Sequence, residues 1–143
     1  MYKRQAISNF TDLEIIESEK DVVLNYLSGP EELSDDYDCL ILPGSKNAME
    51  DGRWLLERGW KRAVRRFALA GKGVLGICGG YQLLGKKIKD PAGVEPDRKE
   101  VPGLDLLPVE TVLEEEKVVR EATGICLVTV SYTHLTLPTN REV

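Results

Sequence analysis

Apolar positions occur in two patterns along the chain. Short continuous runs at Asp38–Leu42 and Gly73–Ile77 are typical of strands buried on both faces of a parallel sheet. Between them, apolar side chains in Trp60–Ala70 recur every three to four residues, with arginines between them, as on an amphipathic helix. The order strand, helix, strand, helix predicts an α/β fold with a doubly wound, mainly parallel sheet and right-handed crossovers.

Capping residues indicate where the helices begin and end. Asn47, with Glu50 three residues later, predicts a capping box, and Gly59 and Gly71 are expected to end the two helices that follow. A short helix is expected through Tyr81–Leu84. Composition assigns the remaining segments. A strand end is expected at Ala6–Asp12, a strand at Asp21–Leu27 and a proline-containing loop at Asp90–Gly103. Two further strands, which would form a partly antiparallel section, are expected at Leu104–Leu113 and Val118–Val128.

Composition and charge narrow the function classes. The 143-residue chain has 19 Lys and Arg against 24 Asp and Glu, a net charge of −5, which leaves no positive field for a nucleic-acid backbone. Its 42% hydrophobic and 30% charged residues are ordinary for a globular domain. No apolar run approaches the ~20 residues of a membrane span. We therefore expect a cytoplasmic protein without nucleic-acid or membrane partners.

Cys78 is the main candidate for chemistry. The segment Gly76–Gly80 has the form G-x-C-x-G between an expected strand and an expected helix, which is the context of a nucleophile elbow. Such a turn holds the nucleophile in a strained conformation above the sheet, and the flanking positions must lack Cβ. The dipole of the next helix favours the thiolate. The alternative is a buried structural cysteine beside a glycine turn.

A second turn is expected at the same edge of the sheet. Pro43–Ser45 follows the preceding strand, and ligands bind at the carboxyl edge in such folds. Its N–H groups, with that of Gly79, could form an oxyanion hole; a simple Pro-Gly turn is the alternative. Cys39 and Cys126 are expected to be small core residues, and the cysteine spacing predicts neither a disulfide framework nor a metal site.

Both ends of the chain resemble translated sequencing-adapter sequence. Residues 1–5 and 130–143 are therefore expected to be foreign to the gene, and residues 6–129 to be part of a domain from a longer protein. His134 is the single histidine and lies in the second foreign segment, so it is left out of the candidate site.

Ordered motifs across Ala6–Thr129 resemble the cobyric acid synthase family. The resemblance implies the first part of a class I glutamine amidotransferase domain, here truncated. Ala48 departs from the family, which usually has threonine there. The motifs that carry the resemblance are Ile7–Asp12, Ile41–Asn47, Met49–Asp51, Trp54–Leu55, Val74–Gly85, Ile88, Asp90–Pro91, Gly93–Glu95 and Gly103–Thr111.

The resemblance also implies roles for particular residues. Cys78 would attack the side-chain amide of glutamine, Gly44 and Gly79 would stabilise the oxyanion, and Tyr81 and Gln82 would line the glutamine pocket. The ammonia would pass to an N-terminal synthetase domain outside this sequence. There, ATP and Mg²⁺ would drive amidation of the corrinoid adenosylcobyrinic acid a,c-diamide in cobalamin biosynthesis. No cofactor or metal is expected in this chain itself.

One catalytic group of the family is not found in the sequence. The family's catalytic histidine lies beyond Thr129, and nothing before that residue replaces it. A cysteine hydrolase needs a base for the thiol and an acid for the leaving amine. The polypeptide alone is therefore expected to lack useful glutaminase activity.

Other interpretations stay open. Two are related amidotransferases with a similar elbow: cobyrinate a,c-diamide synthase and the peptidoglycan glutamate-amidating subunit. The cobyric branch is favoured over these two relatives by the segments Asp90–Pro91, Gly93–Glu95 and Ser45–Asn47. Another class is a non-catalytic α/β binding module in which Cys78 is a core or redox residue. A hydrolase that uses the same elbow by convergence is the last alternative.

Overall fold

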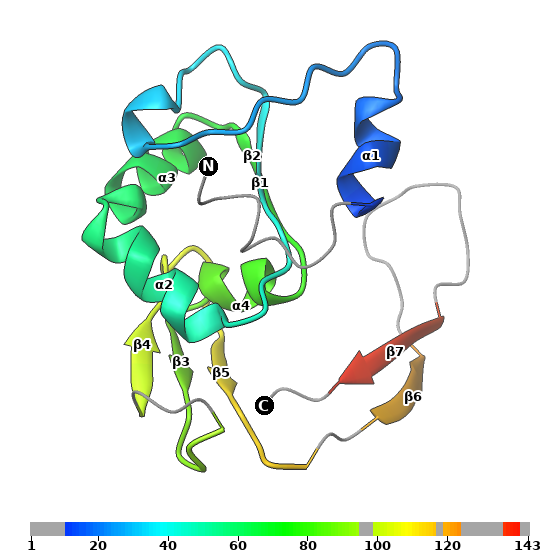
Figure 1. The fold of residues 1–143 in the computed structure, drawn as a ribbon, viewed down its shortest axis with the longest axis vertical. Coiled ribbons are helices and arrows are strands. Elements are labelled where there is room, and N and C mark those ends of the chain that lie inside the picture. Colours follow the sequence, from blue (N-terminus) through cyan, green and yellow to red (C-terminus); the bar gives the residue numbers. More distant parts are fainter. Residues whose placement is uncertain (1–10, 95–98, 117–118, 124–135, 141–143) are drawn as a thin grey trace.

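A computed structural model shows a mixed α/β chain and describes residues 11–94, 99–116, 119–123 and 136–140 (Figure 1). Short helices and strands alternate through the first part, and strands predominate in the second. In chain order the elements are α1 (Thr11–Glu17), the 3-10 helix η2 (Pro30–Glu32), β1 (Cys39–Leu42), α2 (Ala48–Glu57), α3 (Trp60–Leu69), β2 (Gly73–Gly76), α4 (Gly79–Leu84), β3 (Lys87–Lys89), β4 (Glu100–Pro102), β5 (Glu110–Val112), β6 (Val119–Thr123) and β7 (Thr136–Asn140).

The strands β1 and β2 form a two-stranded parallel sheet. Leu40 pairs with Val74, and Leu42 pairs with Gly76. The connection between the strands runs through α2 and α3, which lie together on one side of the sheet (Figure 1). This is the predicted strand–helix–strand crossover. Because the strands are parallel, their carboxyl ends meet at one edge, where α2 and α4 begin.

The main hydrophobic core lies between these helices and the sheet. The helix face predicted within residues 60–70 is confirmed. Trp60, Val64 and Phe67 are buried and Ala63 is partly buried. The arginines between them, Arg62, Arg65 and Arg66, are exposed. Gly59 and Gly71 have φ values of 79° and 80° at the ends of α2 and α3, as expected for helix-ending glycines. The buried members of this core are Leu33, Leu40, Leu42, Trp60, Val64, Phe67, Leu84 and Leu104.

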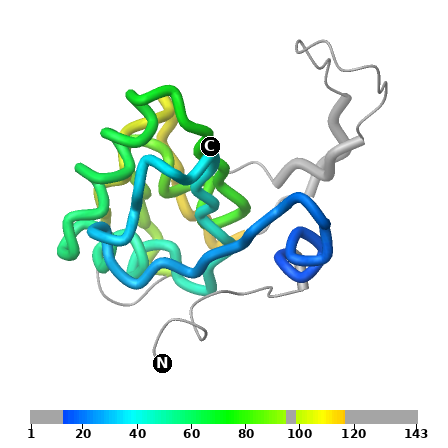
Figure 2. Tube along the Cα trace, turned by 90° about the horizontal axis from the view of Figure 1, so that it is seen from above, coloured from blue at the N-terminus to red at the C-terminus, as the bar shows by residue number. Residues whose placement is uncertain are grey.

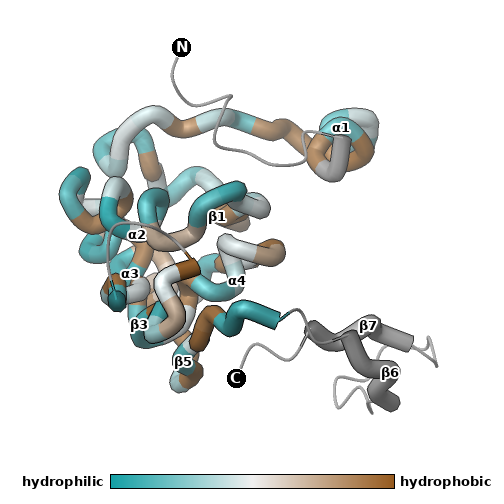
Figure 3. The backbone as a smooth tube through the Cα atoms, turned by 60° about the horizontal axis from the view of Figure 1, so that its bottom comes forward, coloured by the Kyte–Doolittle hydropathy of each residue, from teal (hydrophilic) through white to brown (hydrophobic). Residues whose placement is uncertain are grey.

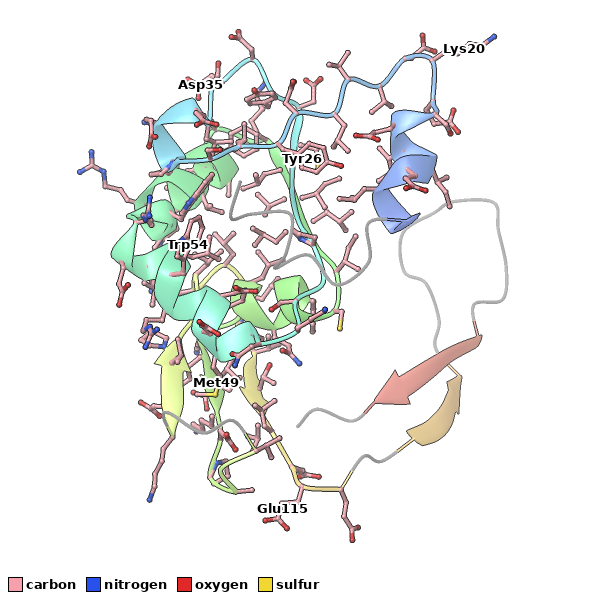
Figure 4. All side chains as sticks on the ribbon, in the orientation of Figure 1. Lys20, Tyr26, Asp35, Met49, Trp54 and Glu115 are labelled. Carbon is pink, nitrogen blue, oxygen red and sulfur yellow. The ribbon has the colours of Figure 1, made fainter. Side chains whose placement is uncertain are left out.

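A second, partly antiparallel sheet lies beneath α2 and α4. Its central strand β3 is antiparallel to β4 and parallel to β5. Met49 at the start of α2 packs on this sheet with Ile88 and Val101 (Figure 4). A second, partly antiparallel section was predicted, but from the wrong strands: β5 is parallel to β3, and β6 belongs to a different sheet. Only residues 110–112 of Leu104–Leu113 form a strand, and the expected loop Asp90–Gly103 contains β4.

The expected strand at Asp21–Leu27 is wrong. The described backbone there has no strand pairing, Val23 is 84% exposed, and the Tyr26 hydroxyl donates a hydrogen bond to Glu17 Oε1 at 3.2 Å. A β-branched and aromatic composition alone does not make a strand, because a strand is stabilised by hydrogen bonds and side-chain pairs with a neighbouring strand. This segment follows α1, which lies to the side of the main body (Figure 2) and carries hydrophobic positions of its own (Figure 3).

The structure describes only part of the expected strand end at Ala6–Asp12. Thr11 opens the helix α1 instead of ending a strand, and residues 6–10 lie outside the described residues. Cys126, His134 and most of the two segments assigned to adapter sequence also lie outside. Residues 136–140 are described: β7 pairs antiparallel with β6, which falls within the expected strand Val118–Val128.

The sheet of β1 and β2 is less buried than a continuous apolar pattern predicts. Leu75 is 47% exposed, and Cys39, expected in the core, is exposed at the first position of β1. Within the described residues each strand has only one neighbour, so one edge of each is unpaired. Successive side chains also alternate between faces, which puts Leu40 in the core and leaves Cys39 on the open face. In the parts that are described, no helix has both the length and the apolar character needed to cross a membrane.

The core makes a direct stability prediction for α3. Phe67 is 1% exposed and Leu69, on the same helix, is 87% exposed. Phe67→Ala should lower the free energy of unfolding by about 3–5 kcal/mol, because it removes buried apolar area and leaves a cavity. Leu69→Ala should change it by less than about 0.5 kcal/mol. Urea unfolding measures both, and equal losses would contradict this core.

Candidate active site

Cys78 occupies a strained turn between β2 and α4. Its backbone has φ 51° and ψ −114°, a region that residues with a Cβ rarely adopt, at a cost of about 1–3 kcal/mol. Its side chain is exposed. The predicted elbow geometry is therefore confirmed. A thiol buried in the core, which was the alternative, does not occur.

Two glycines allow α4 to approach the strand ends closely. A Cβ on Gly76 would lie 2.7 Å from the carbonyl oxygen of Gly80 and 2.7 Å from Tyr81 Cα. A Cβ on Gly80 would overlap the carbonyl oxygen of Leu42 and come within 2.9 Å of that of Pro43. These contacts are with backbone atoms, so a side chain here would displace the helix from the strands. The expectation that the positions flanking Cys78 lack Cβ is confirmed.

The first residue of α4 contacts the turn that follows β1. A Cβ on Gly79 would lie 3.0 Å from Ser45 Cβ and 3.2 Å from Ser45 N. The Pro43–Ser45 turn and the elbow therefore share one edge of the sheet, as predicted. Within the described residues, the Gly79 N–H donates to no other backbone group.

Hydrogen bonds at the start of α2 hold the Pro43–Ser45 turn. The Ser45 hydroxyl donates to Asp51 Oδ2 in a short hydrogen bond and accepts from the Asn47 N–H at 3.0 Å. Asn47 Oδ1 accepts from the Glu50 N–H at 2.6 Å. The capping box predicted from Asn47 and Glu50 is therefore correct for the Asn47 side chain. The Asn47 N–H, however, is bound by Ser45 and not by Glu50.

Asp51 is the residue at this edge that sequence reasoning missed. Burial raises the pKa of its carboxyl above the ordinary value, the hydrogen bond from Ser45 opposes this, and the charge of Glu50 raises it further. A serine and an aspartate six positions apart, around an asparagine N-cap, were the available signal. That signal is weak, because an acidic residue in a first helical turn is explained by the helix dipole alone.

The two residues expected to line a glutamine pocket differ in exposure. Tyr81 is 49% exposed on α4, three positions after Cys78. Gln82 is 7% exposed, so its amide lies within the protein and not on the open side. Their role as pocket residues stays a prediction.

Among the described residues, no group of three or more His, Cys, Asp or Glu side chains could hold a metal ion. A surface depression of about 360 Å³ lies between η2 and α3 and is lined by residues including Glu31, Arg62 and Arg66. It includes neither Cys78 nor the Pro43–Ser45 turn. The candidate site is the edge around Cys78, where the elbow and the Pro43–Ser45 turn meet.

Residues 1–141 match the family model of the CobB/CobQ-like glutamine amidotransferase domain. The chain belongs to this amidotransferase family. Membership fits the strained cysteine turn and the adjoining Pro-Gly turn, and it implies a class I amidotransferase-like fold.

Cobyric acid synthases are among the curated relatives of this amidotransferase domain. The chain is 51% identical over 118 residues to the cobyric acid synthase of Chlorobium phaeobacteroides, which covers 82% of this chain and 23% of the relative. It is 47% identical over 116 residues to that of Clostridium botulinum, covering 81% and 23%. For Moorella thermoacetica the values are 45% over 123 residues, 86% and 24%. The chain thus spans about a quarter of the length of these relatives.

Backbone strain at Cys78 makes a stability prediction. Cys78→Gly should raise the free energy of unfolding by about 1 kcal/mol, because glycine adopts a positive φ without strain while its larger unfolded-state entropy offsets part of the gain. Cys78→Ser keeps the Cβ and should change stability by less than about 0.5 kcal/mol. Thermal or urea unfolding measures this. A glycine variant less stable than the serine variant would show that the turn is unstrained.

Proposed function

We propose that this chain provides the nucleophile and the oxyanion site for release of ammonia from glutamine. Cys78 is exposed at a strained turn, and the adjacent Gly79 contacts a second turn, which contains Gly44. Acyl transfer requires a nucleophile beside N–H donors that bind the oxyanion, and we assign these donors to Gly44 and Gly79. The contact between Gly79 and Ser45, which joins the two turns, is the observation that carries the proposal.

The proposed reaction has two steps. The Cys78 thiolate attacks the side-chain carbonyl carbon of glutamine, and the tetrahedral oxyanion accepts hydrogen bonds from Gly44 and Gly79. The C–N bond then breaks, the proton from the thiol passes to the leaving ammonia, and a glutamyl thioester remains. Water hydrolyses the thioester to glutamate and restores the thiol. The proton carrier is an imidazole base supplied by another part of the protein, as the family resemblance implies.

We extend the proposal to the whole protein and its complete fold. The relatives named above are cobyric acid synthases, which supports the cobyric branch over related amidotransferases. The ammonia would then serve ATP-dependent amidation of adenosylcobyrinic acid a,c-diamide at a synthetase domain. ATP and Mg²⁺ have no part in the step assigned to this chain. The parallel pair β1–β2 with its helical crossover supports a doubly wound sheet for the complete domain.

Affinity labelling tests the glutamine site. The chloroketone analogue of glutamine should alkylate Cys78 roughly tenfold or more faster than it alkylates Cys39, because only Cys78 has a site that orients the analogue. Both thiols are exposed in the same chain, so Cys39 is an internal control. Peptide mapping by mass spectrometry gives the two rates. Equal rates, or labelling of Cys78 that excess glutamine does not slow, would refute a glutamine site.

The family resemblance implies that the catalytic base lies outside this chain, and this makes a second prediction. The 143-residue polypeptide alone should release ammonia from glutamine no faster than its Cys78→Ser variant, since thiol activation and amine protonation both need a proton carrier. A coupled glutamate dehydrogenase assay measures this. Robust turnover that depends on Cys78 would show that the chain contains its own base.

A further inference from the structure

Asp51 and Ser45 form a hydrogen-bonded pair beside the Pro43–Ser45 turn. The Ser45 hydroxyl donates its one proton to Asp51 Oδ2 and accepts from the Asn47 N–H at 3.0 Å. A hydroxyl with a donor partner and an acceptor partner has a fixed direction. Because Asp51 lies in the first turn of α2, this pair fastens the turn to the helix that packs on the core.

Ser45 also contacts the elbow that carries the second proposed oxyanion donor. Its Cβ and N lie 3.0 Å and 3.2 Å from the position a Cβ on Gly79 would take, so the turn and the elbow are in close contact. Gly44 precedes Ser45 directly, so a displacement of Ser45 acts on the Gly44 N–H through a single residue. Donors of an oxyanion hole must be held to within about 0.5 Å of the productive geometry. Movement of Ser45 away from Gly79 would separate the two N–H groups.

The ionised form of the Asp51 carboxylate lowers the stability of the fold. Burial raises its pKa above the ordinary value of aspartate, although the hydrogen bond from Ser45 lowers it. When the folded-state pKa of an acid is raised, the ionised form is less favourable in the fold than in the unfolded chain. Stability is thus reduced above that pKa and recovers as the pH falls towards the ordinary value. An asparagine would accept the same hydrogen bond without this cost.

We infer that Asp51 is a positioning residue, which through the Ser45 hydroxyl holds the Gly44 N–H at the correct spacing from the Gly79 N–H. The inference rests on the proposed function, because it assigns Asp51 a part in stabilising the oxyanion. Asp51 itself contacts no reacting atom. Its effect is on the geometry of the turn, and so on reactions that place an oxygen between the two N–H groups.

The test compares two reagents on the same thiol in the 143-residue chain. The chloroketone of glutamine carries a ketone oxygen that occupies the proposed oxyanion site, and the Cys78 thiolate displaces its chloride to form an S–C bond. Iodoacetamide alkylates an exposed thiol by displacement of iodide and needs no such site. The variants are Asp51→Ala, Asp51→Asn and Ser45→Ala. Glu50→Ala is the matched control, because it removes an exposed carboxylate from the same helical turn.

The expected result is a selective loss. Asp51→Ala and Ser45→Ala should each slow chloroketone labelling of Cys78 by about tenfold, and the double variant should be no slower than either one. Iodoacetamide labelling should stay within about twofold. Asp51→Asn should recover most of the chloroketone labelling rate. At pH 7 its melting temperature should equal or exceed that of the wild type, and the difference in melting temperature should shrink as the pH falls. Glu50→Ala should label as the wild type does.

Two outcomes would overturn the inference. Chloroketone labelling of Asp51→Ala and Ser45→Ala at the wild-type rate would show that the pair does not position the turn. If chloroketone and iodoacetamide labelling of Cys78 slow equally, the variants have lost structure in general. Ser45→Ala is the milder variant for this comparison, because it removes only one hydroxyl oxygen. If wild-type Cys78 and Cys39 react equally with the chloroketone, the proposed function itself is wrong, and the inference falls with it.

Discussion

The structure depends on the close packing of the first turn of α4 against the ends of β1 and β2. Gly80 lies against the carbonyl oxygens of Leu42 and Pro43, and Gly76 lies against the backbone of α4. This packing leaves no room for a relaxed turn between β2 and α4, so Cys78 takes a positive φ. The strain is maintained because the strands and helices on either side are fixed by a common core.

The same packing joins two turns that are distant in sequence. Gly79 touches Ser45 because α4 begins directly over the end of β1, and Ser45 is in turn bound to Asp51 on α2. The helix α2 packs through Met49 on the second sheet. The site is therefore made of backbone groups at the ends of rigid elements, an arrangement suited to holding N–H donors in place. Asp51, whose pKa is raised by burial, lies on α2 beside Ser45 and not beside the sulfur.

Local signals in the sequence predicted the elbow well. Glycines on both sides of Cys78 and the strand-to-helix context were sufficient to predict the strained, exposed turn, because steric rules at such a turn are local. Burial was harder to predict. Cys39 and Leu75 have apolar neighbours, yet they are exposed, since burial depends on which strands lie alongside. Asp51 was missed because its partner is a turn hydroxyl six positions away, and nothing in the spacing identifies that contact.

A structure of the chain alkylated by the chloroketone of glutamine tests the central claim most directly. With the sulfur of Cys78 bonded to the reagent, the account predicts that the ketone oxygen lies about 2.7–3.1 Å from both the Gly44 and Gly79 nitrogens. The turn from Pro43 to Ser45 should keep its contact with Gly79. An oxygen that points into solvent, or one bound by neither N–H group, would contradict the assignment of this edge as an oxyanion site.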